Sequence, residues 1–482
     1  MSALGAQLLA TRLPGAGTIA AALAVALAVI AVLVLVMRRH ADAFPLLAVC
    51  ALPFRVPIST DGRTVNLLVP LYLVVAAGTC TYLLPRWLAL LGAGSRGEPV
   101  ARGENPTLRS WSSWLTPRGT EWILLGAIVL YALQSTYSAD RVKAVENLAF
   151  FYLPFALLFL ILRDVRWRRE LIVRCLGVAV ALAVIFAGVG FVEYYRKSLF
   201  LNPKVVAANQ YSNFFRVNSV FFDPSIYGRF LALVMIAVMT VVLAPRAASD
   251  PARRRRTTIA AAAVLAWLAG GLVTSFSQSS IAALLLGLAV LGAWCWGVRP
   301  ALYLSGALVA LALAVLLLAP AGLHFGLKGS SGSAANATSG RTTLVSGGLE
   351  LFAKRPLEGY GAGSFETEYK RHSEADAESA TSASHTIPVT VAAEQGIIGL
   401  AVYVALLVSA FAVLFRGAGR SPPRIAIAAC FAALVLHTWT YADFLEDPFT
   451  WTLLAVGVAL ARTSASEADG PLPAPGVPAS SV

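Results

Sequence analysis

Apolar runs of roughly 20 residues alternate with short polar segments along most of the chain. An α-helix of that length matches the hydrocarbon thickness of a bilayer. The pattern therefore predicts an all-α, polytopic integral membrane protein with about 12–13 transmembrane helices. The predicted spans are 17–37, 43–57, 64–84, 120–137, 145–162, 171–195, 223–244, 258–275, 280–297, 300–320, 388–415, 424–442 and 448–461, of which 43–57 contains Pro53 and is also compatible with a re-entrant segment.

The largest interruption of this pattern is a hydrophilic loop over residues 321–387, which carries three of the five histidines. It begins with a run rich in Ser and Gly and later passes through the glycine-rich segment 359–363. Apolar residues recur at helical spacing after Arg341 and predict a short amphipathic helix over 341–354. Those apolar residues are Leu344, Val345, Leu349 and Phe352.

Composition agrees with a membrane protein. Hydrophobic residues make up 58% of the chain and charged residues only 13%, whereas a soluble domain carries about 25% charged residues. The run 17–37 is too long for a signal-peptide core and is followed by Arg38-Arg39, so we interpret it as a retained helix. The five cysteines lie inside apolar runs without metal-ligand spacing and are interpreted as packing residues.

The net charge of +13 predicts orientation rather than nucleic-acid binding, because basic residues gather on the cytoplasmic loops of membrane proteins. Seven connections hold 21 of the 38 Lys and Arg residues and are predicted to be cytoplasmic. The loop 321–387 then lies on the extracytoplasmic side. ATP and sugar nucleotides are absent there, so an enzyme at this site needs a donor that has already crossed the membrane.

Two arginines flank a predicted helix start. Asp223 suits the N-cap and Pro224 the first turn, which places this start on the same side as the loop. Arg216 precedes the cap and Arg229 lies about a turn and a half inside the helix. Each is interpreted either as an anion-binding group or as an interfacial anchor whose side chain reaches the membrane surface.

The two ends of the loop hold the other candidates. Arg341 lies at the start of the predicted amphipathic helix, where a guanidinium and helix N–H groups can share a phosphate; the alternative is a surface arginine. His385 lies just before Pro388, at the start of the next span. The helix dipole and nearby arginines favour a neutral imidazole, which is usable as a general base.

Other catalytic patterns are missing from the sequence: no metal-ligand spacing, no Gly-x-Ser-x-Gly turn and no phosphate-binding loop with Lys occurs. Two further clusters are interpreted as structural, an interfacial one (His437, Trp439, Tyr441) and a solvated acidic turn that could also bind a cation (Asp443, Glu446, Asp447).

These motifs resemble those of the O-antigen ligase and O-antigen polymerase superfamily, over about 200–461. His385-Thr386, nine residues and then Gly396-Ile397-Ile398-Gly399 resemble the ligase signature, in which Asn, Ser or Gln is commoner than Thr after the histidine. The run from Arg341 through Arg355-Pro356-Leu357 to the glycines at 359–363 is similar to the family's Arg-to-Pro-Leu-x-Gly-x-Gly segment. Arg216 with Asp223-Pro224 is similar to its upstream Arg and Pro motif.

The resemblance implies a helical glycosyltransferase of the GT-C type that needs no metal or other cofactor. Such an enzyme moves a glycan from an undecaprenyl-diphosphate-linked donor to a saccharide or lipid-linked acceptor, in the bacterial cytoplasmic (inner) membrane and on its extracytoplasmic side. By carry-over, His385 would be the base, and Arg341 and Arg216 would hold the diphosphate. We assign Glu394 to structure. Four further residues are assigned to substrate binding: Arg229, Tyr360, Gly361 and Gly363.

The chain is thus predicted to comprise N-terminal transmembrane helices (1–199), a ligase-like catalytic membrane region (200–461) and a disordered tail (462–482). Ligase and polymerase differ only in the acceptor, which the sequence does not identify. A transporter or flippase of lipid-linked sugars is the alternative from another class; it predicts repeated halves, and no internal repeat is present.

Overall fold

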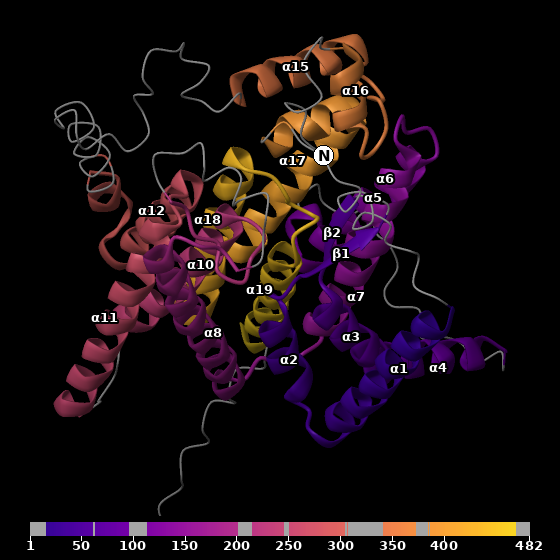
Figure 1. Cartoon of the computed structure of the whole chain (residues 1–482). Helices are drawn as coiled ribbons and strands as arrows, with labels where there is room; N and C mark the ends of the chain where they lie inside the picture. The colour runs from indigo at the N-terminus through magenta and orange to yellow at the C-terminus, as the bar shows by residue number, and fades with distance from the viewer. Residues whose placement is uncertain are drawn as a thin grey trace, which may run out of the picture.

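The computed structural model describes residues 16–60, 63–95, 113–200, 215–244, 250–303, 306, 341–372, 384 and 386–468. This part of the chain is a bundle of helices with one short β-hairpin (Figure 1). Nine of its helices are long and apolar enough to cross a membrane, which confirms the predicted all-α polytopic class. They occupy 20–39, 69–92, 141–162, 169–196, 224–243, 251–274, 278–296, 387–420 and 422–440.

The helices of the N-terminal part are α1 (Ala16–Arg39), α2 (Ala43–Ala51), α3 (Val69–Gly78), α4 (Leu84–Ser95), α5 (Pro117–Ser135), α6 (Arg141–Asn147), α7 (Leu153–Leu162) and α8 (Arg169–Arg196). A π-turn joins α3 to α4 (η1, Thr79–Leu83), another joins α6 to α7 (η3, Leu148–Tyr152), and a 3-10 turn precedes α5 (η2, Ser113–Leu115). The predicted span 120–137 corresponds to α5, which is not among the nine helices.

The remaining helices are α10 (Pro224–Leu243), α11 (Pro251–Thr274), α12 (Gln278–Trp296), α15 (Arg341–Lys354), α16 (Phe365–His372), α17 (Ile387–Phe415), α18 (Pro422–Thr440) and α19 (Pro448–Ala468), with a 3-10 turn at Ala418–Arg420 (η4). α19 fills the predicted span 448–461 and continues past the predicted tail boundary at 462; residues 469–482 lie outside the described part. The predicted span 300–320 also lies mostly outside it.

The predicted span 43–57 is wrong. Its helix, α2, ends at Ala51, and the chain then forms an antiparallel hairpin of β1 (Val56–Thr60) and β2 (Arg63–Leu67), with Val56 opposite Leu67. Pro53 cannot donate a backbone hydrogen bond and clashes with the preceding helical turn, so the helix stops before a bilayer's thickness is reached. An apolar run alone does not distinguish these two outcomes.

The helices form a buried centre with exposed helices around it. In the apolar windows of α10 and α18, 72% and 67% of the residues are buried, whereas the values for α1 and α11 are 6% and 17%. α18 packs against α10, α12, α17 and α19. In Figure 1, α11 lies at the left edge and α1 and α4 at the lower right, with α17–α19 between them. Lipid can therefore cover the outer helices, while the central ones depend on protein packing.

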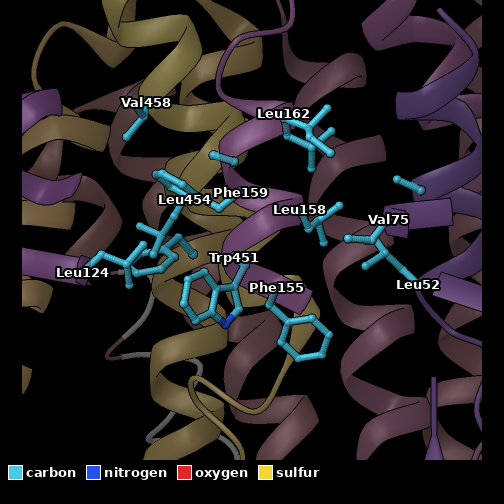
Figure 2. Close-up of a cluster of buried hydrophobic side chains, with 14 of the residues drawn as sticks. Leu52, Val75, Leu124, Phe155, Leu158, Phe159, Leu162, Trp451, Leu454 and Val458 are labelled. Atoms are coloured by element: carbon cyan, nitrogen blue, oxygen red, sulfur yellow. The ribbon is translucent and has the colours of Figure 1, made fainter. Parts of the chain in front are cut away.

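One packing contact fixes the loop between α18 and α19. Trp451 of α19 is fully buried beside Phe155 and Leu158 of α7 (Figure 2). Its indole N–H donates to the carbonyl oxygen of Leu445 at 2.8 Å. Truncating a buried Trp typically costs about 3–5 kcal/mol. We call residues 441–447 the connecting turn; Trp451 holds it against the bundle.

α15 and α16 lie together across one end of the bundle, at the top of Figure 1, which we call the loop end. The connecting turn and the N-terminus of α17 lie at this end. The opposite end is held by ion pairs, including Arg163 Nη1 to Glu121 Oε2 at 2.8 Å and Arg86 Nη1 to Asp164 Oδ2 at 2.6 Å.

Candidate functional site

The start of α10 forms as the sequence predicts. The Asp223 side chain accepts from the amide of Ser225 at 2.6 Å, and Pro224 occupies the first turn. Arg229 lies further along this helix with 1% of its side chain exposed, and its Nη2 is 2.9 Å from Oδ2 of Asp447. Arg229 is therefore not an interfacial anchor. It forms a buried ion pair with the connecting turn.

The same contact overturns the prediction of a solvated acidic turn, at least for Asp447. This carboxylate is fully buried and its Oδ1 also accepts from the amide of Phe449 at 3.1 Å. Burial raises the pKa of Asp447, and the positive charge of Arg229 acts in the opposite direction. A buried charge requires a partner of opposite sign. The sequence could not reveal this pair because its members are more than 200 positions apart.

Arg216 lies at the loop end, where the segment before α10 crosses the turn between α11 and α12. Its Nε donates to the carbonyl oxygen of Ser275 at 3.2 Å, and the next residue, Val217, donates its amide to the carbonyl oxygen of Thr274 at 3.2 Å. Arg216 is half-buried. The structure therefore brings Arg216 and Arg229 to the same end of the bundle, as the sequence predicts.

His437 belongs to the cluster that the sequence predicts to be interfacial, and in the structure it is buried. It is fully buried in α18, with Nε2 3.2 Å from Oγ of Ser280 and 3.4 Å from Oγ of Ser279. The hydroxyl of Ser280 also donates to the carbonyl oxygen of Ser225 at 3.0 Å. This polar cluster joins α10, α12 and α18, so His437 packs inside the bundle, in agreement with a structural role.

The glycine-rich segment docks into a break in α17. In a continuous α-helix the Ile397 amide would donate to the Ala393 carbonyl; here it donates to the carbonyl oxygen of Pro356 at 2.8 Å. The Ala393 carbonyl instead accepts from the amide of Tyr360 at 3.3 Å. The break is at Gly396, whose φ of 64° and ψ of −164° are not helical. Residues 356–361 thus supply hydrogen bonds that α17 lacks.

Close packing accounts for the glycines assigned to substrate binding. Gly361 has φ +93°, and a Cβ there would lie 2.3 Å from Cα of Ser138. Its amide donates to the Glu394 carbonyl at 2.8 Å. The amides of Gly363 and Phe365 donate to the Glu394 carboxylate at 2.9 and 3.0 Å. Glu394 therefore anchors the start of α16, in agreement with a structural role. Substrate binding by Gly361 and Gly363 stays a prediction.

The helix predicted over 341–354 is present as α15, but its buried face differs from the predicted one. Leu344 and Leu351 are buried, while Leu349 is 50% exposed. The buried residues pack with Tyr360, Phe365 and other residues of α16 and α17. Tyr360 is itself 7% exposed, and the guanidinium of Arg355 lies 4.7 Å from its ring centre. In the structure Tyr360 thus belongs to this small core.

A polar cleft of about 590 Å³ opens at the loop end between α5, α6 and η3 on one side and α16 and α17 on the other. The connecting turn contributes residues 442–446 to its wall. A cavity of this size fits the range of small-ligand sites. Its charged and amide side chains are Asp140, Lys143, Glu146, Asn147, Glu366, Lys370, Glu394, Gln395, Asp443 and Glu446. No sequence pattern predicts this cleft, because its walls come from four separate segments.

Asn147 and Glu446 form the best-defined part of the wall. The side-chain amide of Asn147 donates to the hydroxyl of Tyr131 at 2.9 Å and to Oε1 of Glu446 at 2.8 Å. Asn147 is 2% exposed, and its Oδ1 has no hydrogen-bond partner among the described residues. Burial raises the pKa of Glu446 from 4.5 to about 7; the negative charge of Asp443 adds to this increase.

Two predicted catalytic groups fall outside the described parts of the chain: His385 and the side chain of Arg341. Their sequence neighbours are placed. Ser384 is buried and donates its amide to Oγ1 of Thr390 at 3.0 Å, and both Ile387 and Thr390 line the cleft. Within the described residues no group of three or more His, Cys, Asp or Glu side chains could hold a metal ion.

In a comparison with known families, residues 261–404 match the O-antigen ligase family. The matched region runs from α11 through the loop and α15–α16 into α17, and contains Arg341, Tyr360 and His385. The comparison with curated proteins finds no match. The family match confirms the resemblance to the O-antigen ligase superfamily that the motifs indicated.

Proposed function

We propose that this chain, whose residues 261–404 match the O-antigen ligase family, moves a glycan from an undecaprenyl-diphosphate carrier to an acceptor hydroxyl. The reaction would take place on the extracytoplasmic side of the bacterial inner membrane, on a GT-C-type scaffold. The carrying observation is that the loop end gathers Arg216, the start of α17 and a cleft of about 590 Å³. Membership of a polysaccharide-biosynthesis family supports the same reaction.

In the proposed reaction His385 accepts the proton of the acceptor hydroxyl. The hydroxyl oxygen forms a bond to the anomeric carbon of the donor sugar, while the bond from that carbon to the diphosphate oxygen breaks. The diphosphate leaves with the electron pair. Arg341 and Arg216 stabilise its negative charge, since guanidinium groups bind phosphate oxygens in a bidentate way. His385 would thus take the proton of the acceptor, while Arg341 and Arg216 would stabilise the negative charge on the departing diphosphate.

The remaining predicted residues support this chemistry indirectly. Arg229 is paired with Asp447, so its proposed contribution to substrate binding is to fix the connecting turn that walls the cleft. Gly363 lines the cleft directly, whereas Tyr360 and Gly361 hold the glycine-rich segment against α17. The orientation rests on the positive-inside distribution of Lys and Arg.

The test is a transfer assay with purified full-length protein, an undecaprenyl-diphosphate-linked oligosaccharide and two acceptors. One acceptor is a lipid-linked core saccharide and the other a second copy of the lipid-linked glycan. Product with the first indicates a ligase, and lengthened glycan with the second indicates a polymerase. His385→Ala and Arg341→Ala proteins that remain folded should lose at least a hundredfold in rate.

Exposed residues of the same types provide matched controls. His40 and Arg253 lie on exposed surface remote from the loop residues, and their alanine variants should transfer at the normal rate. Full activity of the His385→Ala protein would refute the base assignment. Movement of the lipid across vesicles without any transfer product would instead indicate a flippase.

A further inference from the structure

The cleft at the loop end has a charge opposite to that of a diphosphate site. Its lining contains six carboxyl groups but only two ammonium groups, from Lys143 and Lys370. One of these is engaged at the rim, where Nζ of Lys370 is 2.7 Å from Oε1 of Glu366. The carboxyl groups belong to Asp140, Glu146, Glu366, Glu394, Asp443 and Glu446. Even with Glu446 protonated, because its pKa is raised to about 7, five carboxyl groups face two ammonium groups. Like charges repel, so this lining disfavours a phosphate or an acidic sugar.

The same lining suits the hydroxyl groups of a sugar. Carboxylates are hydrogen-bond acceptors, and a saccharide offers several hydroxyl donors in a small volume. Asn147 adds an independent observation: it lines the cleft, is 2% exposed, and its Oδ1 has no hydrogen-bond partner in the part of the chain that the structure describes. Buried carbonyl oxygens normally have a donor.

The geometry points to an uncharged saccharide segment as the ligand of this cleft, with anionic saccharides excluded. The inference rests on the proposed function in that the saccharide would be part of the donor or acceptor glycan. The connecting turn supports this arrangement: Glu446 faces the cleft, while its neighbour Asp447 pairs with Arg229 in the dry interior. The cleft would then hold the sugar, while the diphosphate would be held elsewhere at the loop end by Arg216 and Arg341, with the pair of Arg229 and Asp447 fixing the turn between them.

Ligand-observed saturation-transfer NMR on the full-length protein in nanodiscs tests this directly. The probes are three neutral trisaccharides, of glucose, mannose and galactose, and trigalacturonate as the anionic one. We expect at least one neutral trisaccharide to bind, and trigalacturonate to bind at least tenfold more weakly. Binding of trigalacturonate at equal or higher affinity, or binding of none of the neutral probes, would overturn the inference.

Two sets of variants locate the binding. Asn147→Ala should weaken binding of the neutral probe about fivefold or more, since a hydrogen bond to the ligand is lost. The rim double variant Glu366→Gln with Asp443→Asn should strengthen trigalacturonate binding several-fold, because two negative charges are removed. Side-chain exposure of 42% at Glu366 makes misfolding a small concern there. If the affinities for both probes are unchanged in both sets of variants, the saccharide binds elsewhere and the assignment is refuted.

Glu350→Gln is the matched control, since Glu350 is exposed on α15 and does not line the cleft; it should change neither affinity. Thermal midpoints of all variants exclude unfolding as the cause of lost binding. The readout needs no transfer. A protein that binds neutral trisaccharides but transfers no glycan would therefore refute the proposed function and leave the saccharide cleft standing.

Discussion

The two sides of the connecting turn treat neighbouring carboxyl groups in opposite ways. Asp447 is fully buried against Arg229, with 1% of each side chain exposed. Glu446, one residue earlier, faces a cleft of about 590 Å³ and accepts a hydrogen bond from Asn147. On the buried side of the turn the guanidinium of Arg229 compensates the charge of Asp447. On the cleft side the amide of Asn147 contacts Glu446, and space for a ligand remains. Position along the chain is thus a poor guide to a carboxyl group's role here.

The largest predicted effect comes from disrupting the buried ion pair between Arg229 and Asp447. Replacing Arg229 by Met leaves Asp447 buried without its cation, and breaking a buried ion pair typically costs about 3–5 kcal/mol. We expect a strongly lowered thermal midpoint of the purified protein in detergent. The double variant Arg229→Met with Asp447→Leu should recover most of the loss, because no lone charge remains. Equal instability of single and double variants would contradict this account.

A smaller effect is expected where the glycine-rich segment contacts the wall of the cleft. Gly361→Ala places a Cβ 2.3 Å from Cα of Ser138 at a φ of +93°, which should destabilise the protein by about 2 kcal/mol. Gly126→Ala is the control in α5, since nothing lies within 4 Å of its added Cβ. Thermal midpoints should fall for the first variant only, and neutral-saccharide binding should fall with it.

The smallest effect is a pH dependence of stability that arises from Glu446, on the cleft side of the connecting turn. The pKa of Glu446 is raised to about 7, so the folded protein prefers its protonated form. That stabilising contribution is complete below about pH 4.5 and is lost as the pH rises through about 7. Glu446→Gln should therefore match the unaltered protein at pH 4.5 and exceed it by about 1–2 kcal/mol at pH 8, allowing for screening by water in the cleft.

Thermal midpoints measured from pH 4.5 to 8 check this. The Asp447→Asn protein is a useful contrast, because it breaks the pair with Arg229 and should be destabilised over the whole range. A constant difference between Glu446→Gln and the unaltered protein at all pH values would show that Glu446 does not titrate in this window.

Local patterns were sufficient for much of the fold and for part of the site. Apolar runs of bilayer length predicted most helices, and Asp223-Pro224 predicted the start of α10 because capping depends only on adjacent residues. The shared position of Arg216 and Arg229 at one end of the bundle also followed from a local pattern, because both residues lie close to the start of α10. The predicted extracytoplasmic orientation of that end stays a prediction.

Contacts between distant segments could not be predicted from the sequence. Arg229 pairs with Asp447, Ser280 with His437, and Asn147 with Glu446, and each pair joins segments far apart in the chain whose packing no periodicity specifies. The hairpin at 56–67 was missed because its two ends were assigned to apolar spans, although Asp61-Gly62 between two β-prone runs is a local hairpin signal. The cleft was missed because it exists only after these segments meet.

The interrupted hydrogen bonding of α17 bears on how the protein is built in the membrane. The carbonyl oxygens of residues 393–395 accept hydrogen bonds from the backbone amides of Tyr360 and Gly361 and from the side-chain amide of Gln134, at 3.3, 2.8 and 3.2 Å. Unsatisfied carbonyl groups are costly in hydrocarbon. The hydrogen bonding of this part of α17 is therefore complete only when the glycine-rich segment and α5 lie against it, which couples the stability of α17 to that of the loop end.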